Sequence, residues 1–517
     1  MKSFLLRFGA LIVSVLSGFD RLRFRGLSRL LSNPRGVNSY LYQHDLQFKD
    51  YAKHAEHLTE TLVANTKALA KAEGTPVVYL NSPNADKEAT ALDIAGQRGL
   101  SSGRIAILSC VESCRTVRVR KNERGHIELR AEPGRCQHFY HYFRHEQLGL
   151  CYVRLQSWFP FTMRIGINGR EWLFRQLQRE RIPFRRQENL LLEVADWQRA
   201  QELLDEQRQT DWPTLLDGFA AATNPLFPYL RDQARVPYYW VTEQSEWASD
   251  LLFRSADDLA RLYPRITRHC IEVLSCRDLL RYLGHRVPEQ GFGRFAGDVK
   301  VDYRERREGL RAKFWYEVNS LKAYDKFGSA LRLETTINQA PLLKVYRTKE
   351  GDPDGPKSWK PLRKGVADLP RQAEISQRAN ERLAESLATI AETTPLGKLL
   401  EPLGRPIIQD GQRSRALNPL TGADGELLRT IANGNFLVQG FRNQDLRLAL
   451  FAETDDADQR RKQSAAVTRK LRLLRAHGLI IKVQKTHRYQ VSAQGRRILT
   501  ALLNAHAADA TRLAAAA

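Results

Sequence analysis

Apolar residues recur at helical spacing in several parts of the chain. Tyr51, Ala55, Leu58 and Leu62 follow one another at intervals of three or four residues and predict a helix over about 44–73. The same spacing predicts helices in NADKEATALDIAGQRG, GREWLFRQLQRERI, VADWQRAQELLDEQ, SADDLARLYPRITRHCIEVL and RQAEISQRANERLAESLATIAE. Gly74 directly follows the helix predicted over about 44–73, and a glycine in this position is typical of a helix end.

Strand-like runs fill most of the space between these helices. In residues 103–168 they are GRIAILSCVES, CRTVRVRKN, HIELRAEP, CQHFYHYF, LGLCYVRLQ and FTMRIGIN, with turn residues between some of them. Further along, GLRAKFWYEVNSLKAYDK and SALRLETTINQAPLLKVYR flank FGS, which indicates a hairpin. The predicted fold class is therefore a multidomain α+β protein, with an antiparallel-sheet body and a helical insert.

Composition and pattern divide the chain into five segments. Three prolines and three glycines in 402–424 indicate a linker. The predicted segments are an N-terminal α+β domain (1–185), a mostly helical region (186–295), a β-hairpin region with a long helix (296–400), the linker (401–422) and a C-terminal domain (423–517).

The beginning of the chain, MKSFLLRFGALIVSVLSGF, is similar to a secretory signal. Arg7 interrupts its apolar stretch, however, and no A-x-A site ends it. Six cysteines in 517 residues fit a reducing compartment. No apolar run approaches the roughly 18 residues of a membrane span. We expect a cytoplasmic protein without a membrane partner, with export as the alternative.

Charge points to the class of partner. Lysine and arginine exceed aspartate and glutamate by 81 − 58 = 23. An excess of this size favours a polyanionic partner, and nucleic acid before a membrane. A basic protein without such a target is the alternative. A second copy of the chain is a further possible partner.

The C-terminal domain combines three predicted helices, a basic hairpin and a closing helix. In its third helix Val467, Leu471 and Leu474 form an apolar stripe, and Gly478 ends the helix. Asn443 is the expected N-cap of the second helix. Residues 459–497 hold twelve lysines and arginines and no carboxylate, enough to neutralise several phosphates.

This order of elements, with LRLLRAHGLI and THRYQVSAQGRR, resembles the winged helix-turn-helix of MarR- and ArsR-like bacterial regulators. The resemblance implies a recognition helix in the major groove of duplex DNA and a basic wing beside it. The expected contact residues are Thr468, Arg469, Lys470, Arg472 and Arg475 on the helix and Lys482, Lys485, His487 and Arg488 in the wing. RNA binding, packing on another protein chain and a solvated cap are the alternatives.

The predicted hairpin at 319–338 carries a candidate catalytic group. Alternation places Glu334 on one strand face with Arg332, and Lys322 with Tyr324 on the other strand. If these faces coincide, lysine and arginine can neutralise a phosphodiester, glutamate can bind metal or a proton, and tyrosine can attack. The alternative is a structural hairpin with a cross-strand ion pair.

The pattern K-x-Y-x-K followed by LR-x-E resembles the initiators of filamentous-phage and rolling-circle replication. Those enzymes bind metal with a His-apolar-His strand, and this chain has no such triplet. The motifs NGREWLFRQL and LRLETTIN are also similar to segments of long bacterial proteins that suggest no particular activity.

Two further groups could hold metal. Cys136 and His138 share one face of a predicted strand, and together with Cys114 and one further ligand they could form a zinc site. Buried thiols without metal are the alternative. The possible cofactors are therefore magnesium or zinc.

Four scattered carboxylates are also candidates, because two-metal nucleases and transposases assemble acids from distant strands and a helix. They are Asp20, Glu112, Glu246 and Asp250, the last two four residues apart in SEWASDLLF and expected one helical turn apart. Surface and capping acids are the alternative. No phosphate-cradling glycine loop, HExxH or GxSxG occurs, so ATPase, zincin and serine hydrolase activities lack support.

The sequence thus predicts a DNA-binding protein of a mobile element, of replication or of transcription control. A metal-dependent nuclease, transposase or replication initiator is the first alternative. An RNA-binding protein without catalysis is the second.

Overall fold

The computed structural model describes residues 1–507 except 273, 286–298, 307–308, 350–351, 353, 389–395, 410, 433–435, 437–439 and 484–485. Two compact units divide the chain. The first holds residues 1–15, 250–335 and 377–517, and the second holds 16–249 and 336–376. Lys485 of the expected wing lies outside the described residues.

Eleven strands form one sheet, in the order β10-β11-β12-β13-β9-β1-β6-β5-β4-β3-β2. Their bounds are β1 Ile12–Leu27, β2 Val77–Tyr79, β3 Gly103–Lys121, β4 Ile127–His145, β5 Gly149–Gln156, β6 Met163–Asn168, β9 Tyr239–Phe253, β10 Val299–Arg306, β11 Gly309–Tyr316, β12 Asn319–Lys326 and β13 Ala330–Ile337. The β2–β3 pair is parallel, whereas β3–β4, β4–β5, β5–β6, β6–β1, β10–β11 and β11–β12 are antiparallel. The α+β class with a mostly antiparallel sheet is therefore confirmed.

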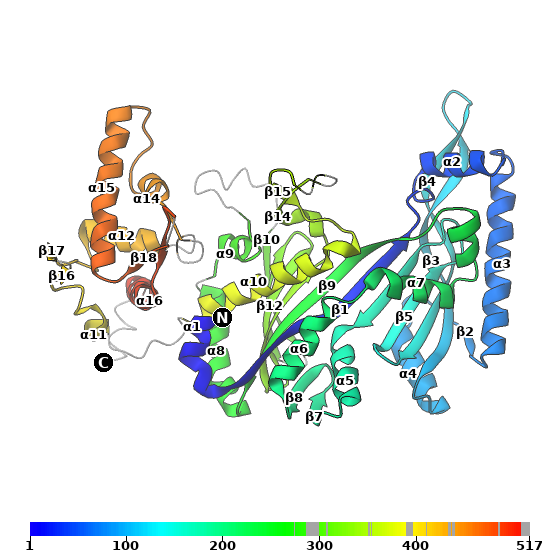
Figure 1. Ribbon diagram of the computed structural model, residues 1–517, viewed down its shortest axis with the longest axis horizontal. Helices are drawn as coiled ribbons and strands as arrows, with labels where there is room; N and C mark the ends of the chain where they lie inside the picture. Colours follow the sequence, from blue (N-terminus) through cyan, green and yellow to red (C-terminus); the bar gives the residue numbers. More distant parts are fainter. Residues whose placement is uncertain are drawn as a thin grey trace. The chain divides into compact units, whose positions relative to one another are not determined.

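Within the second unit, the alternation of apolar and basic residues along β1 explains why one face of the sheet is buried in the core. From Arg21 onward its side chains alternate, so Leu22 and Phe24 are fully buried while Arg23 and Arg25 keep contact with solvent. The helices of this unit, seen in Figure 1, are α2 Pro34–Gln43, α3 Tyr51–Ala72, α4 Lys87–Arg98, α5 Gly169–Arg179, α6 Trp197–Gln207 and α7 Trp212–Thr223. Two-stranded hairpins are formed by β7 Phe184–Gln187 with β8 Leu190–Val194 and by β14 Lys344–Arg347 with β15 Ser358–Pro361.

Local signals set the ends of several helices. The Asp86 side chain accepts a hydrogen bond from the Ala89 amide at 3.0 Å and starts α4, and Gly99 ends it with φ of 59°. Gly169 starts α5 where the chain passes close to β1: a Cβ atom there would lie 2.4 Å from the Phe19 carbonyl oxygen. Glycine is therefore required at this crossing.

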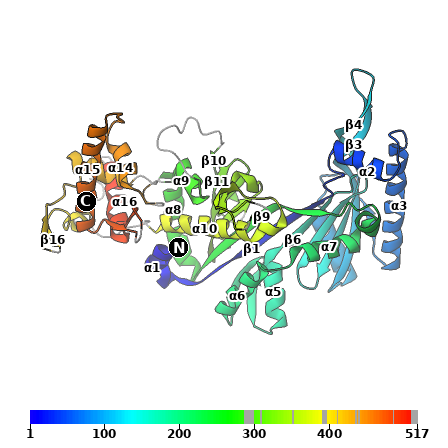
Figure 2. The ribbon, with the colours of Figure 1, turned by 45° about the horizontal axis from the view of Figure 1, so that its top comes forward.

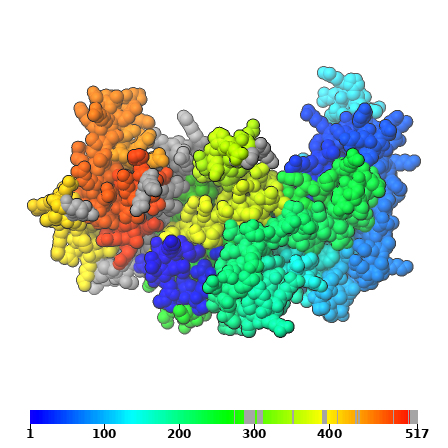
Figure 3. Space-filling model, in the orientation of Figure 1, coloured from blue at the N-terminus to red at the C-terminus, as the bar shows by residue number. Residues whose placement is uncertain are grey.

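The β3–β4 hairpin extends well beyond its neighbours in the second unit. Its outer half stands clear of the surrounding ribbon in Figure 2 and of the surrounding atoms in Figure 3. Most side chains between Arg118 and Arg135 are exposed or half-buried. A two-stranded ribbon of this kind depends on its own cross-strand pairs, such as Arg120 with Glu132 at 2.7 Å.

The first unit contains α1 Lys2–Phe8, α8 Ala256–Glu272 and α9 Cys276–Tyr282, and α10 Leu369–Leu387 has its second half there. The apolar beginning of the chain is thus a short helix followed by β1, which contains Asp20. Among the residues described, none of the helices combines the length and the apolar character that crossing a bilayer requires.

One expectation was wrong: SEWASDLLF is not helical but belongs to β9. From Trp247 to Phe253 every residue of this strand is buried. A strand buried on both faces loses the alternating pattern that identifies strands in a sequence.

The C-terminal part of the first unit has a core of its own. It comprises α11 Leu396–Leu400, β16 Ile407–Gln409, β17 Gln412–Ser414, α12 Gly422–Ala432, α14 Asn443–Leu450, α15 Ala457–Ala476, β18 Ile480–Lys482, β19 Tyr489–Val491 and α16 Ala493–Ala507. Leu403 and Leu417, in the segment expected to be a linker, are nearly fully buried in this core together with Leu427 and Leu474. The His477 Nε2 atom also lies 2.8 Å from the Arg415 carbonyl oxygen.

We expect a fragment of residues 396–517 to melt cooperatively and to be more stable than a fragment of residues 423–517. The shorter fragment lacks Leu399, Leu403 and Leu417, and each buried leucine side chain contributes about 1.5–3 kcal/mol. Thermal unfolding followed by circular dichroism checks this order. Equal melting temperatures for the two fragments would mean that the segment before residue 423 adds nothing to the core.

Candidate functional site

Three neighbouring strands, β1, β9 and β13, carry acidic side chains on one face of the sheet. The opposite face is fixed by contacts with α10. The Thr335 hydroxyl donates to Asn380 of α10 at 2.7 Å, and the Ser245 hydroxyl donates to the same helix at 2.9 Å. Because side chains alternate along a strand, Glu334 and Glu246 lie on the face turned away from α10.

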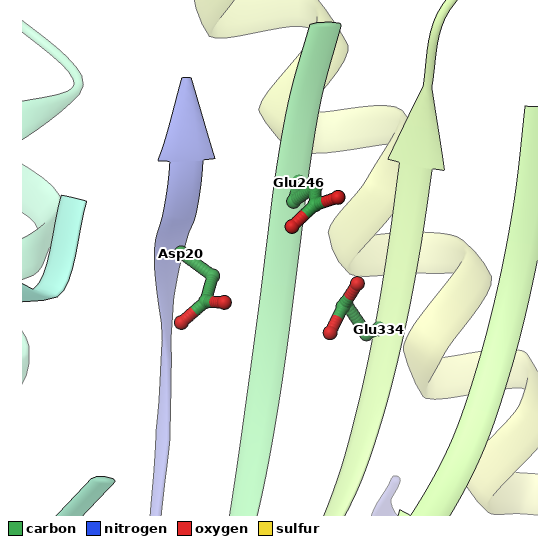
Figure 4. A group of neighbouring side chains, drawn as sticks. All are labelled: Asp20, Glu246 and Glu334. Atoms are coloured by element: carbon green, nitrogen blue, oxygen red, sulfur yellow. The ribbon is translucent and has the colours of Figure 1, made fainter. Parts of the chain in front are cut away.

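Asp20, Glu246 and Glu334 come together on this face, as Figure 4 shows. One ligand atom from each lies within 4.8 Å of the others. The Asn189 amide donates to Asp20 at 2.6 Å, and the Gln244 amide donates to Glu246 at 3.3 Å. Hard carboxylate oxygens gathered in this way are the ligands that Mg²⁺ and Mn²⁺ prefer. Among the described residues, these three carboxylates form the group whose ligand atoms are close enough to hold one metal ion.

Glu334 is also the acceptor for two side chains of β12. The Tyr324 hydroxyl donates to Glu334 Oε2 at 2.9 Å, and the Lys322 ammonium contacts Oε1. Burial alone would raise the pKa of Glu334, but the nearby charges of Lys322 and Arg332 and the bond from Tyr324 outweigh it and hold this pKa well below its usual range. Glu334 is therefore ionised throughout the neutral pH range.

Arg332, two residues before Glu334, makes a different contact. Its Nε atom lies 2.5 Å from Asp250 Oδ1, and its second terminal nitrogen donates to Oδ2 at 3.0 Å. The side chains of Arg332 and Asp250 are 0% and 7% exposed. A two-point contact of this kind is the geometry that lets a guanidinium be buried.

The structure thus brings together three of the four residues expected in the hairpin, Tyr324, Lys322 and Glu334. Arg332 is engaged with Asp250 in the interior. Asp20 and Glu246 were expected only as scattered carboxylates, and no local pattern of the sequence marks them as neighbours.

The other carboxylate candidate, Glu112, lies in an ion network on β3. It accepts hydrogen bonds from Tyr140 at 2.8 Å and from Arg154 at 2.8 Å, and Lys87 lies 3.3 Å away. Although burial would raise the pKa of Glu112, these bonds lower it to about 2. Glu112 is therefore a fixed counter-charge rather than part of the three-carboxylate group.

The expected zinc ligands are only partly assembled. The Cys136 sulfur lies 4.0 Å from the His138 ring nitrogens, and a hydrogen bond between the Cys114 and Cys136 thiols lowers the pKa of Cys114 and raises that of Cys136. Cys114 pairs across β3–β4 with Gly134 rather than with Cys136 or His138. These three residues do not form a group of mutually close ligand atoms among the described residues, so the expected zinc site is not assembled here.

The C-terminal module presents most of its expected DNA-contact residues to solvent. Exposed are Thr468, Arg469, Arg472, Arg475, Lys482 and His487, whereas Lys470 and Arg488 are half-buried. The N-cap expectation for Asn443 was wrong. Arg442 precedes α14, and the Asp445 carboxylate accepts its backbone amide at 2.7 Å. The Asn443 amide instead donates to the Ser464 carbonyl and the Thr468 hydroxyl at 3.0 Å, which ties α14 to α15.

Comparison with known proteins adds little to this geometry. No protein-family model matches the sequence, and no curated protein matches it. Among solved structures, the di-domain ARO/CYC BexL from the BE-7585A biosynthetic pathway covers 56% of this chain and 99% of its own, at 10% identity and a TM-score of 0.16. A likeness at that score supports no inference about fold or activity.

We expect Glu334→Gln to destabilise the protein by about 3 kcal/mol at neutral pH, because Lys322 would lose its buried counter-charge. The effect depends on pH with a definite sign. A glutamate whose folded pKa is depressed stabilises the fold above its unfolded pKa of about 4.3, and this stabilisation is lost as pH falls below that value.

The wild type should therefore lose more stability between pH 6 and pH 3 than Glu334→Gln does, as measured by urea unfolding. Glu426→Gln, a change at an exposed residue of α12, is the control and should follow the wild type. Equal losses of stability in all three proteins would show that the contacts of Glu334 do not lower its pKa in the folded protein.

Proposed function

We propose that the C-terminal module binds duplex DNA as a winged helix. The order α12, α14, α15, β18–β19 and α16 supports this assignment, as does a β-bridge between Phe441 and Tyr489 that adds a third short strand to the hairpin. In such a module the helix before the hairpin enters the major groove. That helix is α15.

The observation that carries the proposal is the outward surface of α15. Val467, Leu471 and Leu474 are its buried residues. Its exposed basic residues are Arg460, Arg461, Lys462, Arg469, Arg472 and Arg475. No carboxylate follows Gln459 on this helix, so from Arg460 onward it carries no negative side chain that would repel a phosphate backbone.

Arg469→Ala and Arg472→Ala should each weaken duplex binding by roughly 1–3 kcal/mol if these side chains reach base edges. Lys482→Ala in the hairpin should weaken binding to all duplex sequences alike and reduce the salt slope by about one, as a phosphate contact does. Titration of a labelled duplex at several salt concentrations measures both. The matched control is Arg429→Ala, an exposed arginine on α12. Equal affinity in the three test variants and the control would place the duplex surface elsewhere.

We propose as a second function the metal-dependent cleavage or transfer of a DNA strand, which would place the protein in replication or transposition. The specific observation in its favour is the meeting of three carboxylates with a tyrosine hydroxyl, 2.9 Å from Glu334. Asp20, Glu246 and Glu334 are the residues that would hold a divalent cation. Such a cation, when bound, stabilises the charge that develops on a phosphodiester.

In this reaction the Tyr324 oxygen attacks the phosphorus of one phosphodiester. A P–O bond forms to the tyrosine, and the bond from phosphorus to the 3′ oxygen breaks. The tyrosine hydroxyl releases its proton to water, and the leaving 3′ oxygen takes a proton from water. The products are a 5′-phosphotyrosine linkage and a free 3′-hydroxyl. Lys322 offers positive charge beside the reacting group.

Incubation with a labelled oligonucleotide and Mg²⁺ or Mn²⁺ tests this function. Tyr324→Phe should remove the covalent protein–DNA adduct while leaving duplex affinity unchanged, because that affinity belongs to the C-terminal module. Glu246→Gln should remove metal-dependent cleavage. Tyr346→Phe, at an exposed tyrosine of β14, is the control. Absence of cleavage and adduct in the wild type, or an adduct that survives in Tyr324→Phe, would reject the proposed reaction.

A further inference from the structure

Three arginines form a row across three neighbouring strands of the second unit. Arg25 on β1 lies opposite Arg164 on β6, which lies opposite Arg154 on β5. Adjacent strands are about 4.8 Å apart, so these side chains leave the sheet side by side. Like charges directly opposite one another destabilise a sheet, and such a row therefore needs a counter-charge.

Among the residues that the structure describes, carboxylates supply only part of that counter-charge. Arg164 donates to Glu243 at 2.6 Å, and Arg154 donates to Glu112 at 2.8 Å. Lys87 shares Glu112 with Arg154. With Arg25 included, four cations face two carboxylates. Burial and the charges of Arg164, Arg115 and Arg154 lower the pKa of Arg25, although Glu243 raises it. The row thus keeps an excess of positive charge.

These arginines remain within reach of solvent. The side chains of Arg164 and Arg154 are 34% and 16% exposed, and Arg25 is half-buried. Their face of the sheet is opposite the core that holds Leu22 and Phe24, which alternate with Arg23 and Arg25 along β1. A smaller apolar cluster that includes Tyr140 and Tyr142 lies on the same face as the arginines.

An aromatic ring lies close to the sheet beside the row. Gly166 on β6 is the cross-strand neighbour of Arg23 on β1 and of Tyr152 on β5. A Cβ atom at Gly166 would lie 2.2 Å from the Tyr152 ring, so the ring covers the glycine closely. Tyr142 lies next to it, with ring centroids 5.7 Å apart. Glycine allows the Tyr152 ring to come close to the strand, and the ring is half-buried at the edge of an apolar cluster.

We propose that this face binds an unpaired nucleic-acid strand, with Arg25, Arg164 and Arg154 at its phosphates and Tyr152 beneath a base. Cations that follow a backbone beside an aromatic platform are the usual means of holding a single strand. The inference extends the proposed function, since a protein that cleaves one DNA strand must hold it unpaired. It concerns residues separate from both α15 and the three-carboxylate group.

The test is titration of a labelled single-stranded oligonucleotide against the full-length protein at several salt concentrations. Arg25→Gln should lower the affinity roughly tenfold at low salt and reduce the salt slope by about 0.7, the value for one lost phosphate contact on a single strand. Arg25→Lys should restore most of the slope. Arg261→Gln, at an exposed residue of α8, is the matched control and should change neither quantity.

Tyr152→Leu should weaken single-strand binding without changing the salt slope, and Tyr152→Phe should bind as the wild type does. A single-stranded RNA of the same sequence, run in parallel, tells which polymer the face prefers. Wild-type affinity in both Arg25→Gln and Tyr152→Leu, with melting temperatures unchanged, overturns the inference.

Duplex binding separates this inference from the proposed function. Arg469→Ala and Arg472→Ala should lose duplex affinity and keep single-strand affinity, while Arg25→Gln should do the reverse. Loss of single-strand binding in Arg25→Gln supports the inference even if the α15 variants bind duplex normally.

Discussion

The buried ion pair between Arg332 and Asp250 is the contact on which the candidate catalytic face depends. An arginine with no exposure must be paired, because an uncompensated charge in the interior costs several kcal/mol. The pair joins β13 to its neighbour β9 and thereby fixes their register. Glu334 is two residues from Arg332, and Glu246 is four residues from Asp250. A slip of one residue in either strand would turn that strand's glutamate to the face of α10.

The local part of this site could be predicted from the sequence. Alternation along the hairpin placed Lys322 and Tyr324 on one strand face and Glu334 on the face of the returning strand, and their contacts confirm that the faces coincide. Asp20 and Glu246 could not be assigned to the same place. They lie more than 200 residues apart on strands that meet only in the folded sheet, and no local pattern records which distant strands pair.

The same division holds for the fold as a whole: local elements could be predicted from the sequence, and the arrangement of distant ones could not. The α+β class, the antiparallel strands and most helices follow from periodicity, but the order of the eleven strands does not. The segment before residue 423 has the prolines and glycines of a linker, yet two leucines within it, Leu403 and Leu417, are buried. Turn-forming composition describes the path of the backbone, whereas membership of a core depends on a few apolar side chains.

The length of α15 has a consequence for the thermodynamics of binding. Its 20 residues span about 30 Å, but its buried side chains begin only at Val467. The first ten residues therefore lack the buried apolar contacts that give most helices their stability, and only Gln463 and Ser464 among them bond to α14. The neighbouring Arg460 and Arg461 also repel each other. We expect this half to fray in the free protein and to become ordered against a phosphate backbone. Part of the favourable enthalpy of association would then be the enthalpy of helix formation, opposed by the conformational entropy that the chain gives up.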